Sequence, residues 1–180
     1  MKDWHPICHC NVLYKLISKV LANRLKVVLS QCISDNQLAF VLGRSILDNA
    51  MVMIEVMHFM KTKTRGNDRY VVFKLDISKA YDRVDWDYLR DVMVKMGFNN
   101  IWIHWMSMCA ELVDYSILVN SEKVGPIIPG CGLWQVDPLS PYLFIIYAEG
   151  LSSLIRDAEE IGAIFANKVC RGVPSIPIFC

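Results

Sequence analysis

Two segments of this 180-residue chain carry the polar side chains best placed for chemistry. The first contains Asp76, which follows a run of apolar and β-branched residues, Tyr70 to Leu75, that predicts a buried strand. A carboxylate at the end of a rigid strand, beside the carbonyl of Ile77, can hold a hard cation such as Mg²⁺, which prefers oxygen ligands. An aspartate in this position is also typical of a helix cap or a turn.

The second segment, Gly132 to Phe144, joins a loop rich in glycine and proline to the start of a predicted helix. Asp137 or Ser140 suits the N-cap of that helix, and Pro138 or Pro141 suits an early helical position. The alternative role is an anion site, because unpaired N–H groups and the helix dipole attract negative charge to a helix N-terminus.

Helical spacing of apolar residues predicts the elements that must position these segments. From Asn11 to Gln31 the predicted apolar stripe consists of Val12, Leu13, Leu16, Ile17, Val20, Leu21, Leu25, Val28 and Leu29, with Lys15, Lys19, Arg24 and Lys26 off it. Further helices are predicted over 45–61, 84–96 (ended by Gly97), 99–112 and 139–160, and a hairpin from 115–119 and 123–128. This order predicts an α+β fold.

The composition narrows the class of protein. A hydrophobic fraction of 54% predicts a folded chain, part of whose apolar surface packs against further protein. A net charge of +1 excludes little, because a nucleic-acid-binding protein can concentrate its charge in one cleft. The seven cysteines contain no C-x-x-C pair, the first residues have no secretory apolar core, and the apolar run 142–148 is too short for a membrane span. The sequence therefore predicts reduced thiols and an intracellular protein, nuclear or cytoplasmic.

Four segments together resemble a known family. KLDISKAYDRV at 74–84 and GLWQVDPLSPYLF at 132–144 look like two signature motifs of reverse transcriptases. SDNQLAFVLGRS at 34–45 resembles the fingers motif that precedes them. NVLYKLISKVLANRLK at 11–26 resembles the start of this domain in plant LINE-type (non-LTR) retrotransposons. The resemblance follows the family order across nearly the whole chain.

The resemblance implies a right-hand polymerase fold, with residues 1–70 in the fingers and 71–180 in a partial palm whose antiparallel sheet is incomplete and covered by helices. It implies that Asp76 is the first catalytic carboxylate and binds Mg²⁺ together with the carbonyl of Ile77. The backbone N–H groups of Lys79 and Ala80 would face the triphosphate of the incoming dNTP.

The resemblance also implies roles in substrate selection. Tyr81 would be the aromatic gate that rejects a ribose 2′-OH, Gln135 would lie against the incoming nucleotide, and Arg44 would contact phosphate or template. Asp82 and Asp137 are expected to be structural. The implied partners are an RNA template, a DNA primer and dNTP, and the implied reaction is phosphoryl transfer assisted by two Mg²⁺ ions. No particular protein partner and no membrane are indicated.

The sequence departs from the family pattern at three points. The aromatic-Ala-Asp-Asp hairpin expected shortly after residue 174 does not occur before Cys180, so a truncated and inactive polymerase without thumb is predicted. Trp134 and Val136 stand where the family usually has Arg and Gly, and valine resists both close backbone approach and a positive φ. His5 replaces a usual arginine in the fingers.

Other hypotheses remain open. A zinc site from His5, Cys8, His9 and Cys10 has spacing too tight for ordinary tetrahedral ligation. A non-catalytic nucleic-acid-binding or protein-interaction module is a second alternative, and a decayed element without function is a third. The basic residues available for the second are Lys15, Lys19, Arg24, Lys26, Lys61, Lys63, Arg65 and Arg69.

Overall fold

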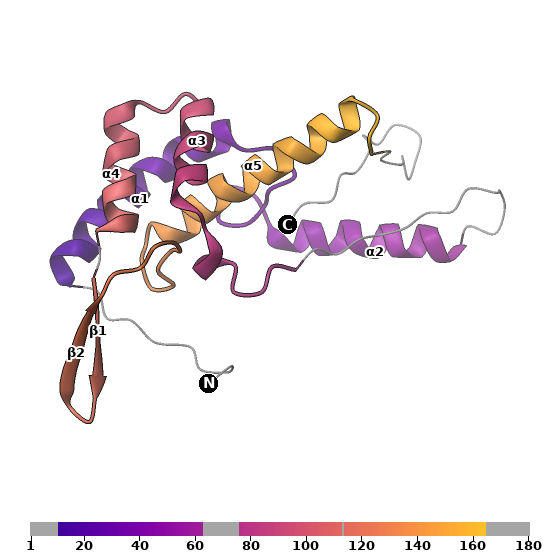
Figure 1. Cartoon of the computed structure of the whole chain (residues 1–180). Helices are drawn as coiled ribbons and strands as arrows, with labels where there is room; N and C mark the ends of the chain where they lie inside the picture. Colours follow the sequence, from indigo (N-terminus) through magenta and orange to yellow (C-terminus); the bar gives the residue numbers. More distant parts are fainter. Residues whose placement is uncertain (1–10, 63–75, 113, 165–180) are drawn as a thin grey trace.

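The computed structural model describes residues 11–62, 76–112 and 114–164, apart from the side chain of Tyr115. In this part of the chain lie the helices α1 (Val12–Cys32), α2 (Ile46–Thr62), α3 (Trp86–Lys95), α4 (Asn100–Glu111) and α5 (Ser140–Glu160), a short 3-10 helix η1 (Tyr81–Arg83), and the strands β1 (Tyr115–Val119) and β2 (Glu122–Ile127) (Figure 1).

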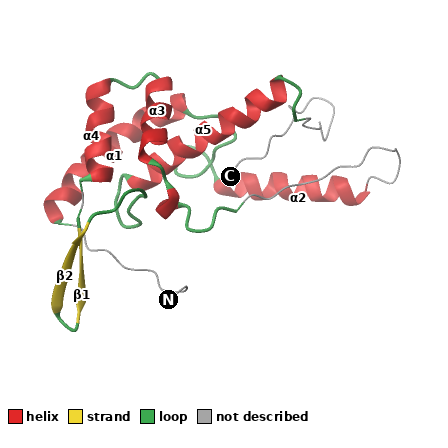
Figure 2. Cartoon of the chain, in the orientation of Figure 1, coloured by secondary structure: helices red, strands yellow, loops and turns green. Residues whose placement is uncertain are grey.

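The predicted mixture of helices and an antiparallel hairpin is confirmed for the described residues (Figure 2). The predicted bounds of the five α-helices and of the two hairpin strands lie within two residues of the observed ones. The predicted strand over 70–75 and the zinc-site hypothesis at residues 5–10 lie outside the described residues. None of the described helices combines the length and apolar character that a membrane span requires.

The core is formed where α1, α3, α4 and α5 pack together (Figure 1). Its largest fully buried apolar side chains come from all four helices and from the segments beside them: Leu25, Leu29, Val84, Met93, Met106, Leu139, Leu143 and Ile146. Each such side chain stabilises the fold by about 1.5–3 kcal/mol relative to an exposed one. The core therefore fixes residues 81–84, which precede α3, and residues 132–144, which lead into α5.

The buried face of α1 is narrower than predicted. Leu21, Ala22, Leu25 and Leu29 are buried beside Ser18. Five members of the predicted stripe are at least half exposed instead: Val12, Leu13, Leu16, Ile17 and Val20. Apolar residues cover more than half of this helix's circumference, so spacing alone cannot say which arc faces the protein. The predicted stripe is therefore only partly buried.

Side chains next to the helices satisfy their first N–H groups. The Oδ1 atoms of Asn11, Asp85 and Asn99 accept hydrogen bonds of 2.8–2.9 Å from backbone N–H groups two or three residues further on. At the other end of α3, Gly97 has a φ of +81°, as predicted for the residue that ends this helix. These local signals explain why the predicted helix ends are close to the observed ones.

The hairpin projects from the packed helices near the ends of α1 and α4 (Figure 1). Its two-residue turn places Asn120 and Ser121 at φ values of 50° and 69°, the geometry of a type I′ turn. Val119 pairs with Glu122 across that turn. The hairpin's described side chains, from Ser116 on, are exposed, so its stability depends on the turn and the backbone ladder.

Close packing of α3 on α5 depends on a glycine inside a helix. A Cβ added to Gly150 would lie 2.4 Å from Tyr88 Oη and 2.7 Å from Val92 Cγ2. The ring of Tyr88 also packs edge-on against Tyr147, with centroids 4.9 Å apart. The absence of a side chain at position 150 therefore allows α3 to approach α5.

Substituting Gly150→Ala should lower the free energy of unfolding. Overpacking costs about 1–3 kcal/mol, and the better helix propensity of alanine recovers up to about 1 kcal/mol, so a net loss near 1 kcal/mol is expected. Urea denaturation measures it, with Ser153→Ala on the exposed side of α5 as the control. A Gly150→Ala protein as stable as the control would contradict this packing.

Candidate active site

The segment that follows Asp76 forms a tight turn with an unusual backbone. Lys79 has a φ of +54°, in the left-handed region, and Ala80 is right-handed with φ −53° and ψ −43°. The N–H of Asp82 donates to the Lys79 carbonyl at 3.0 Å. Alternation of left- and right-handed residues turns successive N–H groups toward one side, which is how backbone nests bind anions.

Tyr81 is fixed by an aromatic contact. Its ring stacks on Phe144 of α5, with centroids 5.0 Å apart and an angle of 12° between the planes. Burial raises the pKa of the Tyr81 phenol, so the side chain is neutral at physiological pH. The stacked ring forms a rigid surface next to the turn at Lys79.

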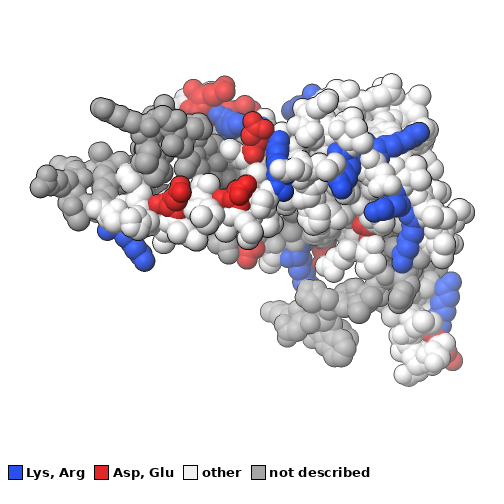
Figure 3. All heavy atoms as spheres, turned by 180° about the vertical axis from the view of Figure 1, so that it is seen from behind, with Lys and Arg blue, Asp and Glu red and all other residues white. Residues whose placement is uncertain are grey.

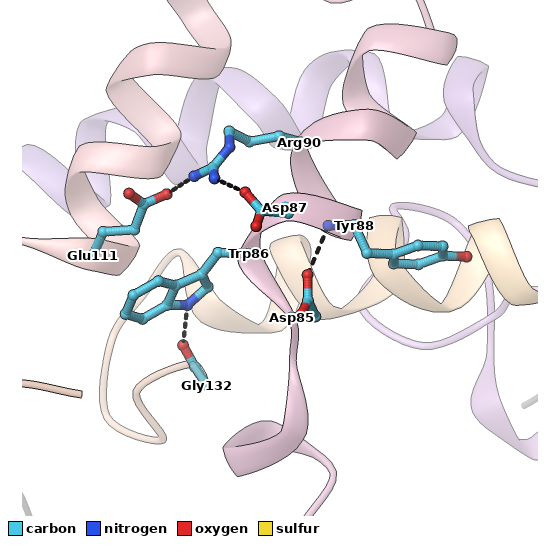
Figure 4. A network of polar contacts seen from close by, with 7 residues as sticks. All are labelled: Asp85, Trp86, Asp87, Tyr88, Arg90, Glu111 and Gly132. Atoms are coloured by element: carbon cyan, nitrogen blue, oxygen red, sulfur yellow. Dashed lines mark hydrogen bonds and ion pairs between the residues drawn. The ribbon is translucent and has the colours of Figure 1, made fainter. Parts of the chain in front are cut away.

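Backbone hydrogen bonds join this turn to the loop before α5. Leu133 N–H donates to the Tyr81 carbonyl and Gly132 N–H donates to the Val84 carbonyl, both at 2.8 Å. The indole Nε1 of Trp86 donates to the Gly132 carbonyl, also at 2.8 Å (Figure 4). Two segments about fifty residues apart in sequence are therefore held side by side.

The close contact between these two segments requires a glycine at position 132. It has a φ of +99°, and an added Cβ would lie 3.3 Å from Asp82 Cα and 3.3 Å from the carbonyl oxygens of Tyr81 and Asp82. Sequence reasoning considered the missing glycine at Val136 and overlooked Gly132. The position of Gly132 in a loop rich in glycine and proline was the available signal. The spacing of residues in the sequence cannot show, however, that this glycine lies against residues 81 and 82.

Asp137 is a buried carboxylate that joins α1 to the start of α5. It accepts hydrogen bonds from the hydroxyl of Ser18 and, at 3.2 Å, from the N–H and hydroxyl of Ser140. Leu139 is the N-cap residue of α5, so the prediction of Asp137 or Ser140 at that position is wrong. Asp137 accepts the Ser140 N–H from two residues before the N-cap. Burial raises the pKa of its carboxyl, and the hydrogen bonds from Ser18, Leu139 and Ser140 oppose that rise.

Cys109 lies close to this carboxylate. Burial, assisted by the charge of Asp137, raises the pKa of the Cys109 thiol to about 11. The thiol is therefore protonated and unreactive at physiological pH. Its backbone carbonyl accepts a hydrogen bond of 2.8 Å from Tyr14 Oη, which ties α4 to α1.

Arg44 holds the turn after α1 together. Its Nη1 donates to the carbonyls of Ser34 and Gln37, both at 2.6 Å, and its Nη2 pairs with Asp35 at 3.1 Å. Ser34 in turn donates to buried Glu149 of α5 at 3.0 Å. Arg44 thus shapes the segment between α1 and α2, and its predicted contact with phosphate or template stays a prediction.

The residues predicted for the reacting centre are exposed. Asp76 and Ile77 precede the turn at Lys79, and Gln135 lies in a second turn, closed by a hydrogen bond of 3.4 Å from Asp137 N–H to the Trp134 carbonyl. Trp134 is buried and anchors that turn. Val136 is not among the described residues with a positive φ, so this position does not use the left-handed backbone that valine resists.

The described residues do not complete a two-metal centre. No group of three His, Cys, Asp or Glu side chains suited to one metal occurs among them. Two divalent ions close together need several anionic oxygens, so Asp76 and the Ile77 carbonyl cannot hold them without further ligands.

Polar contacts brace the first turn of α3. Arg90 pairs with Asp87 on its own helix and with Glu111 of α4 (Figure 4). Both contacts are partly exposed, and such pairs contribute up to about 1 kcal/mol each. Together with the bond from Trp86 to Gly132, they fix α3 relative to both α4 and the loop before α5.

Comparison with known proteins identifies the family. Residues 1–170 match the family described as reverse transcriptase (RNA-dependent DNA polymerase). The chain belongs to the reverse transcriptase family. The prediction of this family from the four motifs is confirmed, while the plant origin and the truncation stay predictions.

The relatives point to retrotransposable elements. An uncharacterized 149 kDa protein of transposon TX1 from Xenopus laevis is 29% identical over 156 residues, 87% of this chain and 12% of that protein. The retrovirus-related Pol polyprotein from the type-2 retrotransposable element R2DM of Drosophila melanogaster is 25% identical over 168 residues, 93% of this chain and 15% of that protein.

A shorter match links the chain to a plant sequence. An uncharacterized mitochondrial protein of Arabidopsis thaliana is 44% identical over 59 residues, 33% of this chain and 48% of that protein. Together these matches identify a reverse transcriptase domain of the non-LTR retrotransposon kind. The chain spans less than half the length of each of these three relatives.

Replacing Gly132 by alanine should weaken the junction between the two motifs. An alanine at this φ, with its Cβ against the backbone of Asp82, is expected to lower the free energy of unfolding by about 1–3 kcal/mol. Denaturant unfolding measures the loss. Gly130→Ala in the same loop is the matched control, because an added Cβ there meets nothing within 4 Å. Equal stability of the two variants would show that the close approach is absent.

The raised pKa of Asp137 predicts a pH dependence of stability. Its contribution is complete below the pKa of an unfolded aspartate, about 3.9, and is lost as the pH rises through the higher folded pKa. The stability of the unmodified chain relative to Asp137→Asn should therefore fall as the pH rises from about 3.9. Urea titrations across this range measure it, with exposed Asp91→Asn as the control. A difference that grows with pH would contradict the assignment.

Proposed function

We propose that this chain forms the part of an RNA-directed DNA polymerase that receives the incoming deoxynucleotide. Residues 1–70 would belong to the fingers and residues 71–180 to a partial palm. The observation that supports this most strongly is the pair of backbone hydrogen bonds from residues 132 and 133 to residues 84 and 81. They bring the segment with Gln135 beside the segment with Asp76 and Tyr81.

The turn at Lys79 is suited to a phosphate group. The backbone alternation at Lys79 and Ala80 supports a nest of N–H groups, and the exposed Lys79 side chain adds a positive charge. We propose that these donors bind the triphosphate of a dNTP. The Arg44 guanidinium is bound to residues 34, 35 and 37. We propose that it affects template binding indirectly, by holding the segment between α1 and α2 in its shape.

Tyr81 would select the sugar. Its ring stacks on Phe144, so it cannot swing away without losing an aromatic contact worth about 0.5–1.5 kcal/mol. A rigid ring beside the triphosphate site can exclude a ribose 2′-OH while admitting deoxyribose. Gln135, exposed next to buried Trp134, is free to lie against the nucleotide.

Metal binding would require more than these residues provide. We propose that Asp76 and the Ile77 carbonyl contribute to a Mg²⁺ site whose other ligands lie outside the described residues. Template, primer and chain extension accordingly belong to the larger polymerase. We expect residues 1–180 alone to bind nucleotide without extending a primer.

Nucleotide binding tests the proposal. Saturation-transfer NMR should detect dNTP bound to the chain, and Tyr81→Ala should reduce its preference for dNTP over rNTP by about tenfold, or 1.4 kcal/mol. Tyr81→Phe, which keeps the ring, should preserve the preference. Gln135→Ala should weaken binding of both nucleotides, whereas Gln31→Ala, on the exposed side of α1, should not.

Circular dichroism of each variant checks that the fold is retained. Absence of dNTP binding at millimolar concentration would refute the proposal. So would a Tyr81→Ala protein that is folded and discriminates between the two sugars as well as the unmodified chain does.

A further inference from the structure

The turn that carries Gln135 has two buried ends. Trp134 and Asp137 are 5% and 4% exposed, and Gln135 lies exposed between them. Asp137 N–H closes the turn on the Trp134 carbonyl. The Trp134 end is held by the hydrogen bond from Leu133 N–H to the Tyr81 carbonyl. The position of Gln135 therefore depends on what holds the Asp137 end.

A residue from outside this segment holds the Asp137 end. The Asp137 carboxylate accepts hydrogen bonds from Ser18, Leu139 and Ser140. Leu139 and Ser140 lie two and three residues further along the same segment, so they move together with the carboxylate. Among the described residues, the hydroxyl of Ser18 is thus the one donor that ties this carboxylate to another part of the chain.

The Ser18 hydroxyl lies in a helix face that is otherwise apolar. Ser18 is fully buried on α1, beside the buried side chains of Leu21, Ala22 and Leu25. Two apolar side chains could fill the space of Ser18 and Asp137 without the free-energy cost of removing a carboxylate from water. What the polar pair adds is direction, because a hydrogen bond fixes the relative position of its two groups.

The basic surface of α1 does not hold this carboxylate. The helix carries four basic residues and no acidic one, and, seen from behind, basic side chains gather over the half of the molecule that contains α1 (Figure 3). None of the ion pairs among the described residues, however, includes Asp137. A neutral hydroxyl is its partner on α1, so the contact depends on the geometry of a hydrogen bond.

We propose that Ser18 is a positioning residue of the nucleotide site, which holds Gln135 in place through Asp137. The hydroxyl fixes the carboxylate, the carboxylate fixes the second end of the turn, and the turn presents Gln135 to the nucleotide. The inference rests on the proposed dNTP site. It gives a part in that site to a residue of α1 that lies 119 positions before Asp137 in the sequence.

A second hydroxyl on α1 provides a matched control. Tyr14 Oη donates to the Cys109 carbonyl of α4 at 2.8 Å, one helical turn before Ser18. This bond also fastens α1 to the core, but it does not contact the turn of Gln135. Loss of either hydroxyl weakens the attachment of α1, whereas only the loss of Ser18 releases Asp137.

Binding of dTTP to the variants tests the proposal. Ser18→Ala removes the positioning hydroxyl, Tyr14→Phe removes the control hydroxyl, and Gln135→Ala removes the side chain that is positioned. Saturation-transfer NMR measures the Kd of each variant and of Ser18→Ala combined with Gln135→Ala. Circular dichroism checks each fold. If Ser18→Ala does not fold, Ser18→Cys, which has a similar shape and a weaker donor, takes its place.

The Ser18 and Gln135 variants should show the same loss. Ser18→Ala should weaken dTTP binding by about threefold or more, and the double variant should bind no more weakly than Gln135→Ala alone, because both changes remove one interaction. Tyr14→Phe should bind dTTP as the unmodified chain does, although it is less stable toward urea.

Substitution of Asp137 separates hydrogen bonding from charge. In Asp137→Asn, Oδ1 can accept from Ser140 and Nδ2 can donate to the Ser18 oxygen, whereas Asp137→Ala can do neither. The asparagine variant should therefore recover most of the dTTP affinity that the alanine variant loses. Equal losses in the two variants would overturn the proposal.

Amide hydrogen exchange separates this inference from the proposed function. In Ser18→Ala the Asp137 N–H should exchange at least about threefold faster, while the core amides of α5 keep their rates. That result in a chain that binds no dTTP would refute the nucleotide site and retain the link between α1 and the turn. An unchanged rate at Asp137 would refute the link itself.

Three further results would overturn the proposal. They are a folded Ser18→Ala protein that binds dTTP as well as the unmodified chain, losses from Ser18→Ala and Gln135→Ala that multiply in the double variant, and a Tyr14→Phe protein that loses as much affinity as Ser18→Ala. The last of these would mean that any loosening of α1 disturbs the site.

Discussion

Two backbone hydrogen bonds hold together the two segments that form the candidate active site. Gly132 and Leu133 donate to the carbonyls of Val84 and Tyr81, and through them the loop before α5 lies against the turn that follows Asp76. A side chain on Gly132 would meet the backbone of Asp82 at 3.3 Å, so the contact depends on glycine. Each residue proposed to contact the nucleotide follows or precedes this junction by a few positions. The junction is thus the constraint from which the geometry of the site follows.

The core makes that junction rigid. α5 begins directly after the loop, and its first turns supply Phe144 for the ring of Tyr81. Asp137 fastens the same end of α5 to Ser18 of α1, at the expense of burying a carboxylate. Removing a partner from such a buried polar group is more damaging than the net value of the bond, because the remaining group is left without solvent. The start of α5 is therefore a place where packing and site geometry depend on the same residues.

Sequence reasoning succeeded where the determining signals are local. The helix-ending Gly97 and the hairpin turn that contains Asn120 depend on a few neighbouring residues, and both were predicted. The capping role of Asn99, which was predicted to lie inside its helix, was not. Sequence reasoning failed where the structure depends on contacts between residues far apart in the sequence. Which arc of α1 is buried depends on α4 and α5, and the need for Gly132 arises from the backbone at residues 81 and 82. The family was found from four motifs in order, while the roles of Asp76, Gln135 and Arg44 remain predictions, as does the strand over 70–75.

The apolar surface left by this arrangement is a consequence of the same packing. The helices around α5 bury one arc of α1 and leave another exposed, and α2 lies outside the group. Exposed apolar side chains in a row usually mark a binding surface.

Amide hydrogen exchange at Gly132 and Leu133, followed by NMR in the folded chain, tests the central claim most directly. If both N–H groups are held by the carbonyls of Val84 and Tyr81, they should exchange orders of magnitude more slowly than in an unstructured peptide, and as slowly as core amides of α5. Exchange of these two amides at the rate of a free loop, in a chain whose α5 amides are protected, would show that the two motifs do not form one site.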